Sequence, residues 1–122
     1  MSKPLVQQVC ERARGLVDNP RTWTQYAIAR AGNHRACEPT DKRAVRFCAF
    51  GAILRAAHDI AGAADEDRAQ KLADQAAMRI TGHHNLFAAF EELIATNDSP
   101  SHSADSAHVA VLALFDKALA KR

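Results

Sequence analysis

The chain has 122 residues, of which 48% are hydrophobic and 25% are charged, and its formal net charge is +2. This composition predicts one folded domain over residues 1–122 and excludes a largely disordered chain. No apolar run approaches the roughly 18–20 residues that a membrane-spanning helix needs, so we expect no membrane contact.

The N-terminal stretch becomes charged too early to resemble a secretory signal. Cys10, Cys37 and Cys48 are odd in number and form no Cys-x-x-Cys motif. Together these features predict free thiols in a reducing, cytoplasmic compartment.

The charge is unevenly distributed along the chain. Residues 1–60 hold ten Lys or Arg against five Asp or Glu, whereas residues 61–122 hold six against nine. A basic surface for nucleic acid or for an acidic partner would give this pattern, and so would two complementary faces of one domain. We favour the second interpretation, because no basic cluster is interleaved with aromatic residues.

Residues 2–18 have the apolar spacing of a first helix, which Asn19 and Pro20 end. Residues 21–38 are the least helical part. The pattern predicts a β-hairpin with strands at 23–30 and 35–38 and a turn at 31–34. An irregular segment that covers the neighbouring helices is the alternative.

Residues 40–60 predict the central helix, with Thr40 as its N-cap. Gly51 inside this helix costs about 0.5–1 kcal/mol relative to Ala. Close approach of another backbone would explain it best, although a bend or a bound ligand would serve as well.

Three more helices follow. The first opens with the acidic residues Asp65, Glu66 and Asp67, which suit the N-terminal end of a helix dipole. Asn85 and Ser103 can act as N-caps of the other two. We assign Phe87 and Ile94 to the inward face of the second of these helices. The predicted fold is therefore mainly α, a compact bundle of about five helices with a short β-hairpin between the first and second.

Four short pieces of the sequence occur together in a familiar order. They are Trp-Thr-Gln at 23–25, Cys-Ala-Phe-Gly-Ala at 48–52 after an Arg-Phe pair, Asn-Asp at 97–98, and the segment 111–118. The combination resembles a family of small bacterial and phage proteins known as a domain of unknown function, over roughly residues 5–120. That family would have Trp in place of Phe47, another large aromatic. The resemblance implies a cytosolic, mainly helical domain and no reaction.

Cys48 is the most chemically suggestive residue. A nucleophilic thiol needs a lowered pKa and a base within reach, which His58, His83, His84 or His102 could supply. However, we expect Cys48 about two turns inside a helix, packed as a small hydrophobic side chain. We therefore assign no catalytic residue.

Six His residues raise the question of a metal site. His83 and His84 are adjacent, and His102 and His108 are six residues apart, so neither pair has ligand spacing on a helix. We expect no metal ion and no cofactor.

Candidate contacts to a ligand or partner lie in the Trp-Thr-Gln and Asn-Asp motifs. In this hypothesis Trp23 stacks against a ligand and Asp98 anchors its polar group. We favour a structural role instead, in which the Asn-Asp pair hydrogen-bonds its local backbone. The candidate residues are Trp23, Gln25, Tyr26, Cys48, Asn97 and Asp98.

Arg43 and Arg46 would share one side of the predicted central helix. We favour the interpretation that both side chains lie on a solvated helix face. The functional alternative is that they contact a phosphate or an acidic partner.

The sequence favours a non-enzymatic interaction or regulatory module that contacts an unidentified protein partner, with a homodimer as one form. Two alternatives remain open. One is a Cys48-dependent hydrolase or transferase, and the other is a nucleic-acid-binding protein that uses the basic N-terminal half.

Overall fold

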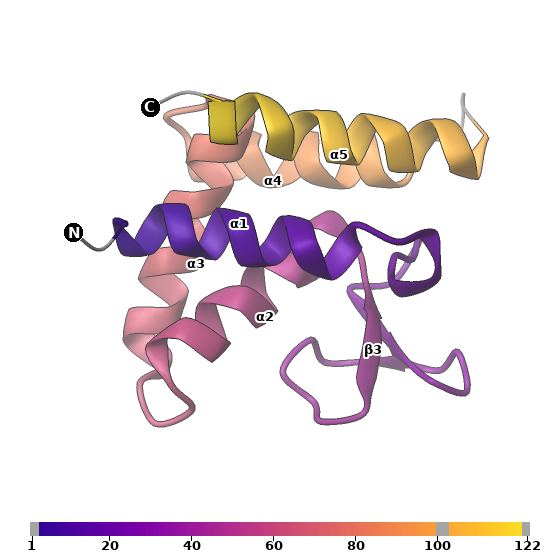
Figure 1. The fold of residues 1–122 in the computed structure, drawn as a ribbon, viewed down its shortest axis with the longest axis horizontal. Helices are drawn as coiled ribbons and strands as arrows, with labels where there is room; N and C mark the ends of the chain where they lie inside the picture. The colour runs from indigo at the N-terminus through magenta and orange to yellow at the C-terminus, as the bar shows by residue number, and fades with distance from the viewer. Residues whose placement is uncertain (1–2, 100–102, 121–122) are drawn as a thin grey trace.

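The computed structural model describes residues 3–99 and 103–120, which form a mainly helical fold with a small sheet (Figure 1). In chain order the elements are α1 (Leu5–Val17), the 3-10 helix η1 (Pro20–Thr22), β1 (Ala29–Ala31), β2 (Ala36–Cys37), β3 (Ala44–Phe47), α2 (Ala49–Ala61), α3 (Glu66–Thr81), α4 (Leu86–Asn97) and α5 (Ala104–Ala120). The predicted fold class, five helices with strands between the first two, is confirmed.

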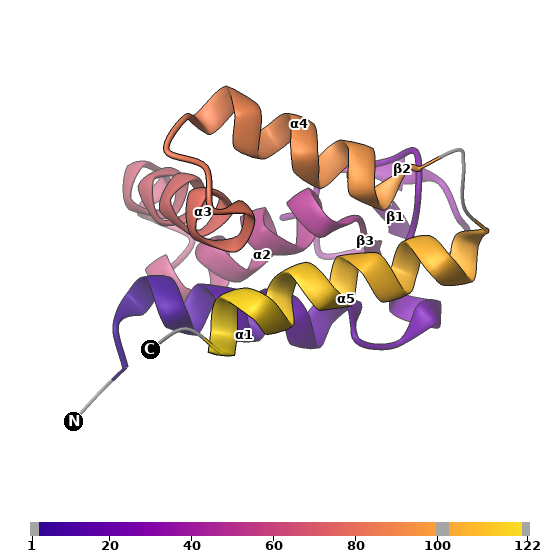
Figure 2. The same ribbon diagram turned by 90° about the horizontal axis from the view of Figure 1, so that it is seen from above.

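The helices pack around α2, which contacts α1 on one side and α3 on the other. Helix α5 runs beside α1 and also contacts α4, as Figures 1 and 2 show. None of the helices within the described ranges is both long and apolar enough to cross a bilayer.

The core of α2 and α3 is built largely from alanine. Six of these side chains are fully buried: Ala49, Ala52, Ala56, Ala57, Ala76 and Ala77. Small side chains allow the helix backbones to approach closely, which explains how an alanine-rich chain with few aromatic residues fills its interior.

The strands form a three-stranded antiparallel sheet in the order β2-β1-β3. The turn between β1 and β2 is closed by the His34 N–H, which donates to the Ala31 carbonyl at 2.9 Å. The predicted hairpin is thus present, but β1 is much shorter than the expected strand at 23–30. Trp23 makes only a single bridge, to Phe47 on β3.

The prediction of one helix over residues 40–60 is wrong in its first half. Residues 44–47 form β3, and α2 begins only at Ala49 with Cys48, not Thr40, as its N-cap. Val45 and Phe47 are residue types that favour strands. Pairing with β1, about fifteen residues earlier in the chain, makes this segment a strand and not the start of the helix. Arg43 and Arg46 therefore share no helix face, because Arg43 lies before β3 and Arg46 lies within it.

The predicted reason for Gly51 is confirmed. A Cβ atom at this position would lie 2.0 Å from the backbone oxygen of Ile28, so only glycine fits where the start of β1 crosses α2.

The later helices begin where the sequence predicts. Asp65 accepts from Arg68 N at 3.1 Å, Asn85 from Ala88 N at 3.0 Å, and Ser103 from Ser106 N at 3.2 Å. Gly82 ends α3 in the left-handed conformation, with φ of 76°. These caps fix where α3, α4 and α5 begin and where α3 ends.

Helix α4 departs from its predicted orientation. Leu93 is fully buried, but Phe87 and Ile94 are 70% and 50% exposed, so the expectation that both face inward is wrong. Figure 2 shows α4 along one edge of the molecule, with the strands near its C-terminal end. Its apolar residues extend around more of the helix than one packed face can cover.

Candidate functional site

The side chain of Asn97, the last residue of α4, connects the two motifs that the sequence singles out. Its Oδ1 accepts from Trp23 Nε1 at 2.7 Å and from the Ala49 N–H at 2.9 Å. Its Nδ2 donates to the Thr24 carbonyl at 3.0 Å and to Asp98 Oδ1 at 2.8 Å. The side chain is 1% exposed, and both ends of the amide are hydrogen-bonded.

These bonds correct the expectation that the Asn-Asp pair serves its local backbone. Trp23 lies 74 positions from Asn97, and Ala49 lies 48 positions from it. The Asn97 amide therefore joins the segment before the sheet to the first turn of α2 and to the end of α4.

Gln25 and Tyr26 extend the same cluster toward the surface. Gln25 Nε2 donates to the Asn97 carbonyl at 2.9 Å, and the Tyr26 N–H donates to Asp98 Oδ1 at 3.0 Å. Tyr26 has a φ of 63°, which is uncommon for a residue with a side chain. Asp98 stabilises this conformation, which leaves the Tyr26 ring 69% exposed.

Trp23 does not form an open stacking wall. Its side chain is 8% exposed, and its ring lies 5.0 Å, centroid to centroid, from the His108 ring. His108 Nε2 is 2.6 Å from the Val17 carbonyl at the end of α1, which requires the Nε2–H form of the imidazole. The sequence did not point to this role for His108, because its partner is a backbone atom far away in the chain.

Cys48 lies at the N-terminus of α2, not two turns inside a helix. Its Sγ accepts from the Gly51 N–H at 3.2 Å, and its own N–H donates to the Ile28 carbonyl at 3.1 Å. A helix N-terminus usually favours a thiolate. Here burial opposes it more strongly and raises the pKa of the Cys48 thiol, so the group is protonated at neutral pH.

None of the hydrogen bonds described for Cys48 involves a histidine. His83 Nε2 pairs with Glu92 Oε1 at 3.0 Å, and His102 lies outside the described residues. Within residues 3–99 and 103–120, no group of three or more His, Cys, Asp or Glu side chains is placed to hold a metal ion.

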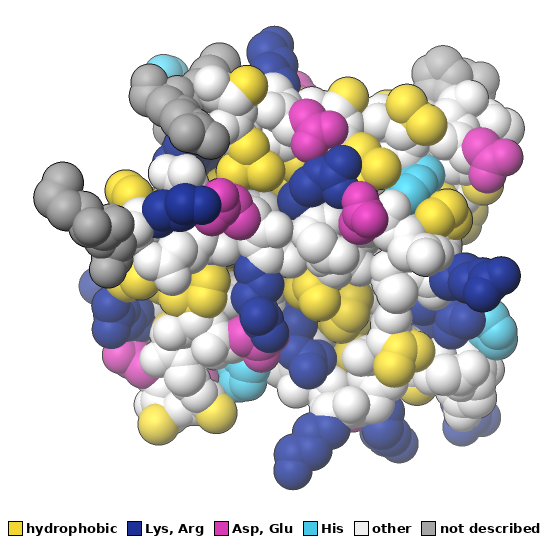
Figure 3. All heavy atoms as spheres, viewed as in Figure 1, with side chains coloured by type: hydrophobic (Ala, Val, Ile, Leu, Met, Phe, Trp, Pro, Cys, Tyr) yellow, Lys and Arg dark blue, Asp and Glu magenta, His cyan; other side chains and the backbone are white. Residues whose placement is uncertain are grey.

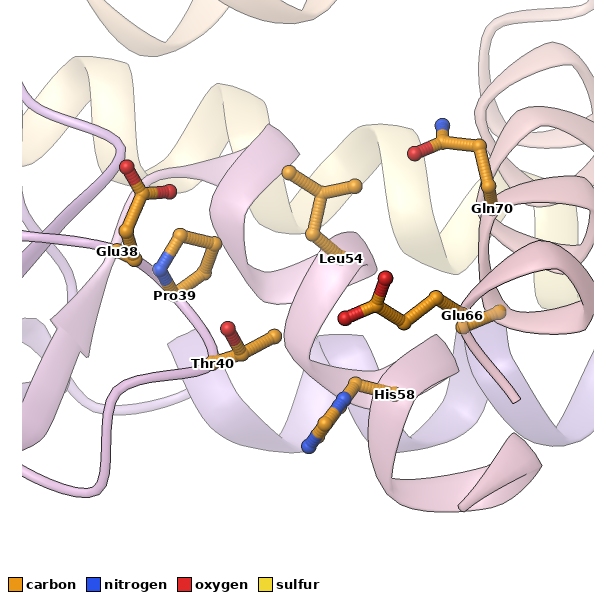
Figure 4. Close-up of a pocket in the computed structure, with 8 residues that line it drawn as sticks. Glu38, Pro39, Thr40, Leu54, His58, Glu66 and Gln70 are labelled. Carbon is orange, nitrogen blue, oxygen red and sulfur yellow. The ribbon is translucent and has the colours of Figure 1, made fainter. Parts of the chain in front are cut away.

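A cleft of about 270 Å³ opens where the segment after β2 meets α2 and α3. Glu38, His58 and Glu66 line it, together with apolar side chains such as Leu54. In Figure 4 the His58 ring and the carboxylates of Glu38 and Glu66 point in different directions. The cleft thus has polar walls without a convergent set of ligands.

A model of a family of unknown function (DUF6197) matches residues 1–121. The chain belongs to this family. Comparison with curated proteins and with solved structures finds no match for the chain. The family match covers both motifs that meet at Asn97, and it assigns no reaction to them.

The structure brings five of the six candidate residues into direct contact: Trp23, Gln25, Tyr26, Asn97 and Asp98. Cys48 is next to this cluster, because it precedes Ala49, whose N–H binds Asn97. Most of the polar groups in the cluster are buried and bonded to one another. The cluster fixes the positions of Tyr26 and the start of β1, which lie at the surface.

Sequence reasoning missed the exposed apolar residues on α4 and just before β1. Tyr26, Ile28, Phe87 and Ile94 are between 42% and 70% exposed. Phe90 of α4 packs edge-on against Phe50 of α2, with ring centroids 4.6 Å apart. The signal was the number of large apolar residues on α4, which exceeds what one buried stripe of a twelve-residue helix accommodates.

Proposed function

We propose that the protein is a non-enzymatic interaction module that contacts another protein through the outer face of α4 and the start of β1. We call this surface the α4 face and define it by Tyr26, Ile28, Phe87 and Ile94. The single observation that carries the proposal is the exposure of these four large apolar side chains, two of them just before β1 and two seven positions apart on α4. Such patches on folded domains commonly mark contact sites.

The cluster around Asn97 supports a contact role for the α4 face. Asp98 accepts from the Tyr26 N–H, and the next turn of α4 toward its N-terminus carries Ile94. On the other side, Ile28 is fixed by its backbone contact with Gly51. A preorganised apolar surface loses little conformational freedom on binding, which favours association.

The occupant that the charges favour is a second copy of the chain. Residues 80–116, which include α4, hold five Asp or Glu and no Lys or Arg. Residues 21–46, which include β1 and β2, hold six Lys or Arg against two Asp or Glu. Figure 3 shows Lys and Arg side chains projecting at the lower right, over the strands.

A two-fold arrangement would use both charged regions. The apolar residues of the two copies would meet at the centre, and the acidic α4 of each copy would face the basic strands of the other. A two-fold interface is made by the same patch on both copies, so a surface with both charges at opposite ends matches itself.

Light scattering coupled to size-exclusion chromatography tests this homodimer. We expect the mass of the wild-type protein to approach that of two chains at a protein concentration of about 100 μM, which exceeds a dissociation constant in the low micromolar range. Phe87→Glu should give a monomer, because it places a carboxylate in the apolar centre. Val109→Glu is the matched control, because Val109 is 65% exposed on α5 and is not part of the α4 face.

A wild-type protein that stays monomeric at millimolar concentration would contradict the homodimer. Equal effects of Phe87→Glu and Val109→Glu would show that added negative charge, and not the α4 face, controls association. Circular dichroism of both variants should match that of the wild type, because both positions are exposed.

The proposed setting is the bacterial cytoplasm. Cys10, Cys37 and Cys48 are all free thiols, which a reducing compartment maintains.

A Cys48-dependent hydrolase or transferase has one observation in its favour, the position of the thiol at a helix N-terminus. The raised pKa weighs against it. Iodoacetamide labelling at neutral pH separates the two: we expect Cys48 to react more slowly than the same cysteine in an unfolded peptide. Faster reaction would favour the enzyme.

Nucleic-acid binding is supported by the net charge of +4 in residues 21–46. It would appear as binding of an oligonucleotide that weakens steeply as salt rises. The absence of binding at low salt would eliminate it.

A further inference from the structure

The sheet places two arginines side by side. Arg30 on β1 and Arg46 on β3 are direct cross-strand partners, so their side chains leave the same face of the sheet. The neighbouring pair, Ala29 and Phe47, is buried on the helix side, which leaves the arginines on the outer face. Like charges in directly opposed positions are unfavourable unless something compensates them.

Arg30 is held in place without losing its charge. Its Nε donates to Thr24 Oγ1 at 2.9 Å, Nη1 to the His34 carbonyl at 2.9 Å and Nη2 to the Gln25 carbonyl at 3.2 Å. All three acceptors are neutral. The guanidinium is thus oriented by uncharged groups, as in a preformed anion site.

Arg46 has a donor without an acceptor. Its Nη1 is buried and makes no hydrogen bond, although the side chain as a whole is only half-buried. Among the ion pairs of the described residues, none involves Arg30 or Arg46, and Asp41, in the segment before β3, is paired with Arg43 at 3.0 Å. A buried donor on a cation is costly to leave unpaired, so this side chain favours an additional hydrogen-bond acceptor.

Space is available beside the pair. The residue opposite Arg30 on β2 is Ala36, which is exposed and carries only a methyl group. The outward row across the sheet therefore consists of one small side chain and two guanidinium groups.

We propose that this outer face of the sheet binds a phosphate group of a small molecule, with Arg30 and Arg46 as its two cationic ligands. A guanidinium presents paired N–H groups that match two oxygens of a phosphate, and two guanidiniums together match its double negative charge. The pair is compact and does not form a long basic stripe, which favours a single phosphate over a nucleic-acid backbone.

Calorimetric titration with inorganic pyrophosphate and phosphate, at constant ionic strength set with chloride, tests the site. We expect saturable binding to the wild type and at least tenfold weaker binding to Arg46→Gln. Arg35→Gln is the matched control, because Arg35 is an exposed cation at the start of β2 and has no place in the row. It should bind like the wild type.

A second measurement needs no variant. The side-chain Nε–H resonances of Arg30 and Arg46 should shift during a phosphate titration of the wild type and stay unchanged in chloride. The same titration on Phe87→Glu separates this site from the α4 face, since a monomer should still bind phosphate. A wild-type protein that never dimerises would thus contradict only the proposed function, and a wild type that dimerises without binding phosphate would contradict only this inference.

Three results would overturn the proposal. The first is that phosphate gives no binding heat and no resonance shifts beyond those that chloride gives. The second is that Arg46→Gln and Arg35→Gln weaken phosphate binding equally, which would indicate non-specific electrostatic attraction to the basic surface. The third is tight, salt-sensitive binding of a single-stranded oligonucleotide that requires Arg46 while phosphate and pyrophosphate do not bind. That result would assign the face to nucleic acid.

Discussion

Replacement of Asn97 by alanine should strongly destabilise the protein. The truncation removes the acceptor of Trp23 Nε1 and of the Ala49 N–H, and it removes the donor to the Thr24 carbonyl. All three groups belong to residues that are 9% exposed or less. The lost bonds would therefore leave three buried polar groups without partners.

Each buried polar group without a partner costs about 1–3 kcal/mol. Water that enters the space left by the amide would satisfy part of this demand. We therefore expect Asn97→Ala to lower the free energy of unfolding by about 3–5 kcal/mol, a large share of the roughly 5–15 kcal/mol typical of a domain.

Urea denaturation, followed by circular dichroism, measures this loss as a lower midpoint at an unchanged slope. Asn85→Ala is the matched control, because the Asn85 side chain accepts only from the exposed Ala88 N–H at the start of α4. That variant should lose about 1 kcal/mol. A loss below about 1 kcal/mol for Asn97→Ala would refute the reasoning, because the buried bonds would then have no net value.

Three further predictions follow from single groups. Gly51→Ala should lower the free energy of unfolding by about 2–4 kcal/mol, because the new Cβ would overlap a backbone oxygen. Gly15→Ala in α1 meets no neighbouring atom and should raise it by about 0.5–1 kcal/mol. Urea denaturation midpoints measure both changes, and equal effects would contradict the close approach of the Ile28 backbone to α2. Burial raises the pKa of the Cys10 thiol from 9.0 to about 11, so the folded state holds the proton longer than the unfolded state. The contribution of Cys10 to stability should be constant below pH 9 and fall by about 2–3 kcal/mol as the pH rises to 11. Cys10→Ala should remove this part of the pH dependence in denaturation curves, whereas the part that comes from the raised pKa of Cys48 should stay. The hydrogen bond from the Arg43 guanidinium lowers the pKa of Asp41 to about 2, and a titration of the carboxyl groups by NMR should show this midpoint. Arg43→Ala should move the Asp41 midpoint upward toward 3.8. An unchanged midpoint in that variant would show that another group lowers the pKa.

The helices outside the sheet region could be predicted because their signals are local. Asp65, Asn85 and Ser103 are standard N-cap residues, and Gly82 is the usual residue for a helix end. Each needs only neighbours within four positions to act, so one sequence suffices to recognise it.

The strand β3 could not be predicted because its cause is remote. The segment 44–47 is apolar enough for either a strand or a helix, and pairing with β1 decides between them. Cys48 compounds the error, since a thiol is a weak acceptor and an unusual N-cap. The sequence therefore placed the start of the helix at Thr40, where the residue type was more familiar.

The sequence predicted which residues make up the candidate site but not how their side chains contact one another. Trp23 and Asn97 stood out as motif residues, yet the bond between their side chains spans most of the chain. Exposure of Phe87 was not predictable from spacing, because the spacing shows that a helix has an apolar face and not how wide the face of its neighbour is.

The Asn97 amide has a consequence for how the chain can be divided. It joins segments from both sides of α3, so neither the sheet with α1 and α2 nor the pair α4 and α5 has complete hydrogen bonding by itself. A fragment that stops before α4 would leave the indole N–H of Trp23 and the first amide of α2 without their acceptor. The two portions of this small protein should consequently open together, and the amide proton of Ala49 should exchange with solvent only when the entire molecule unfolds.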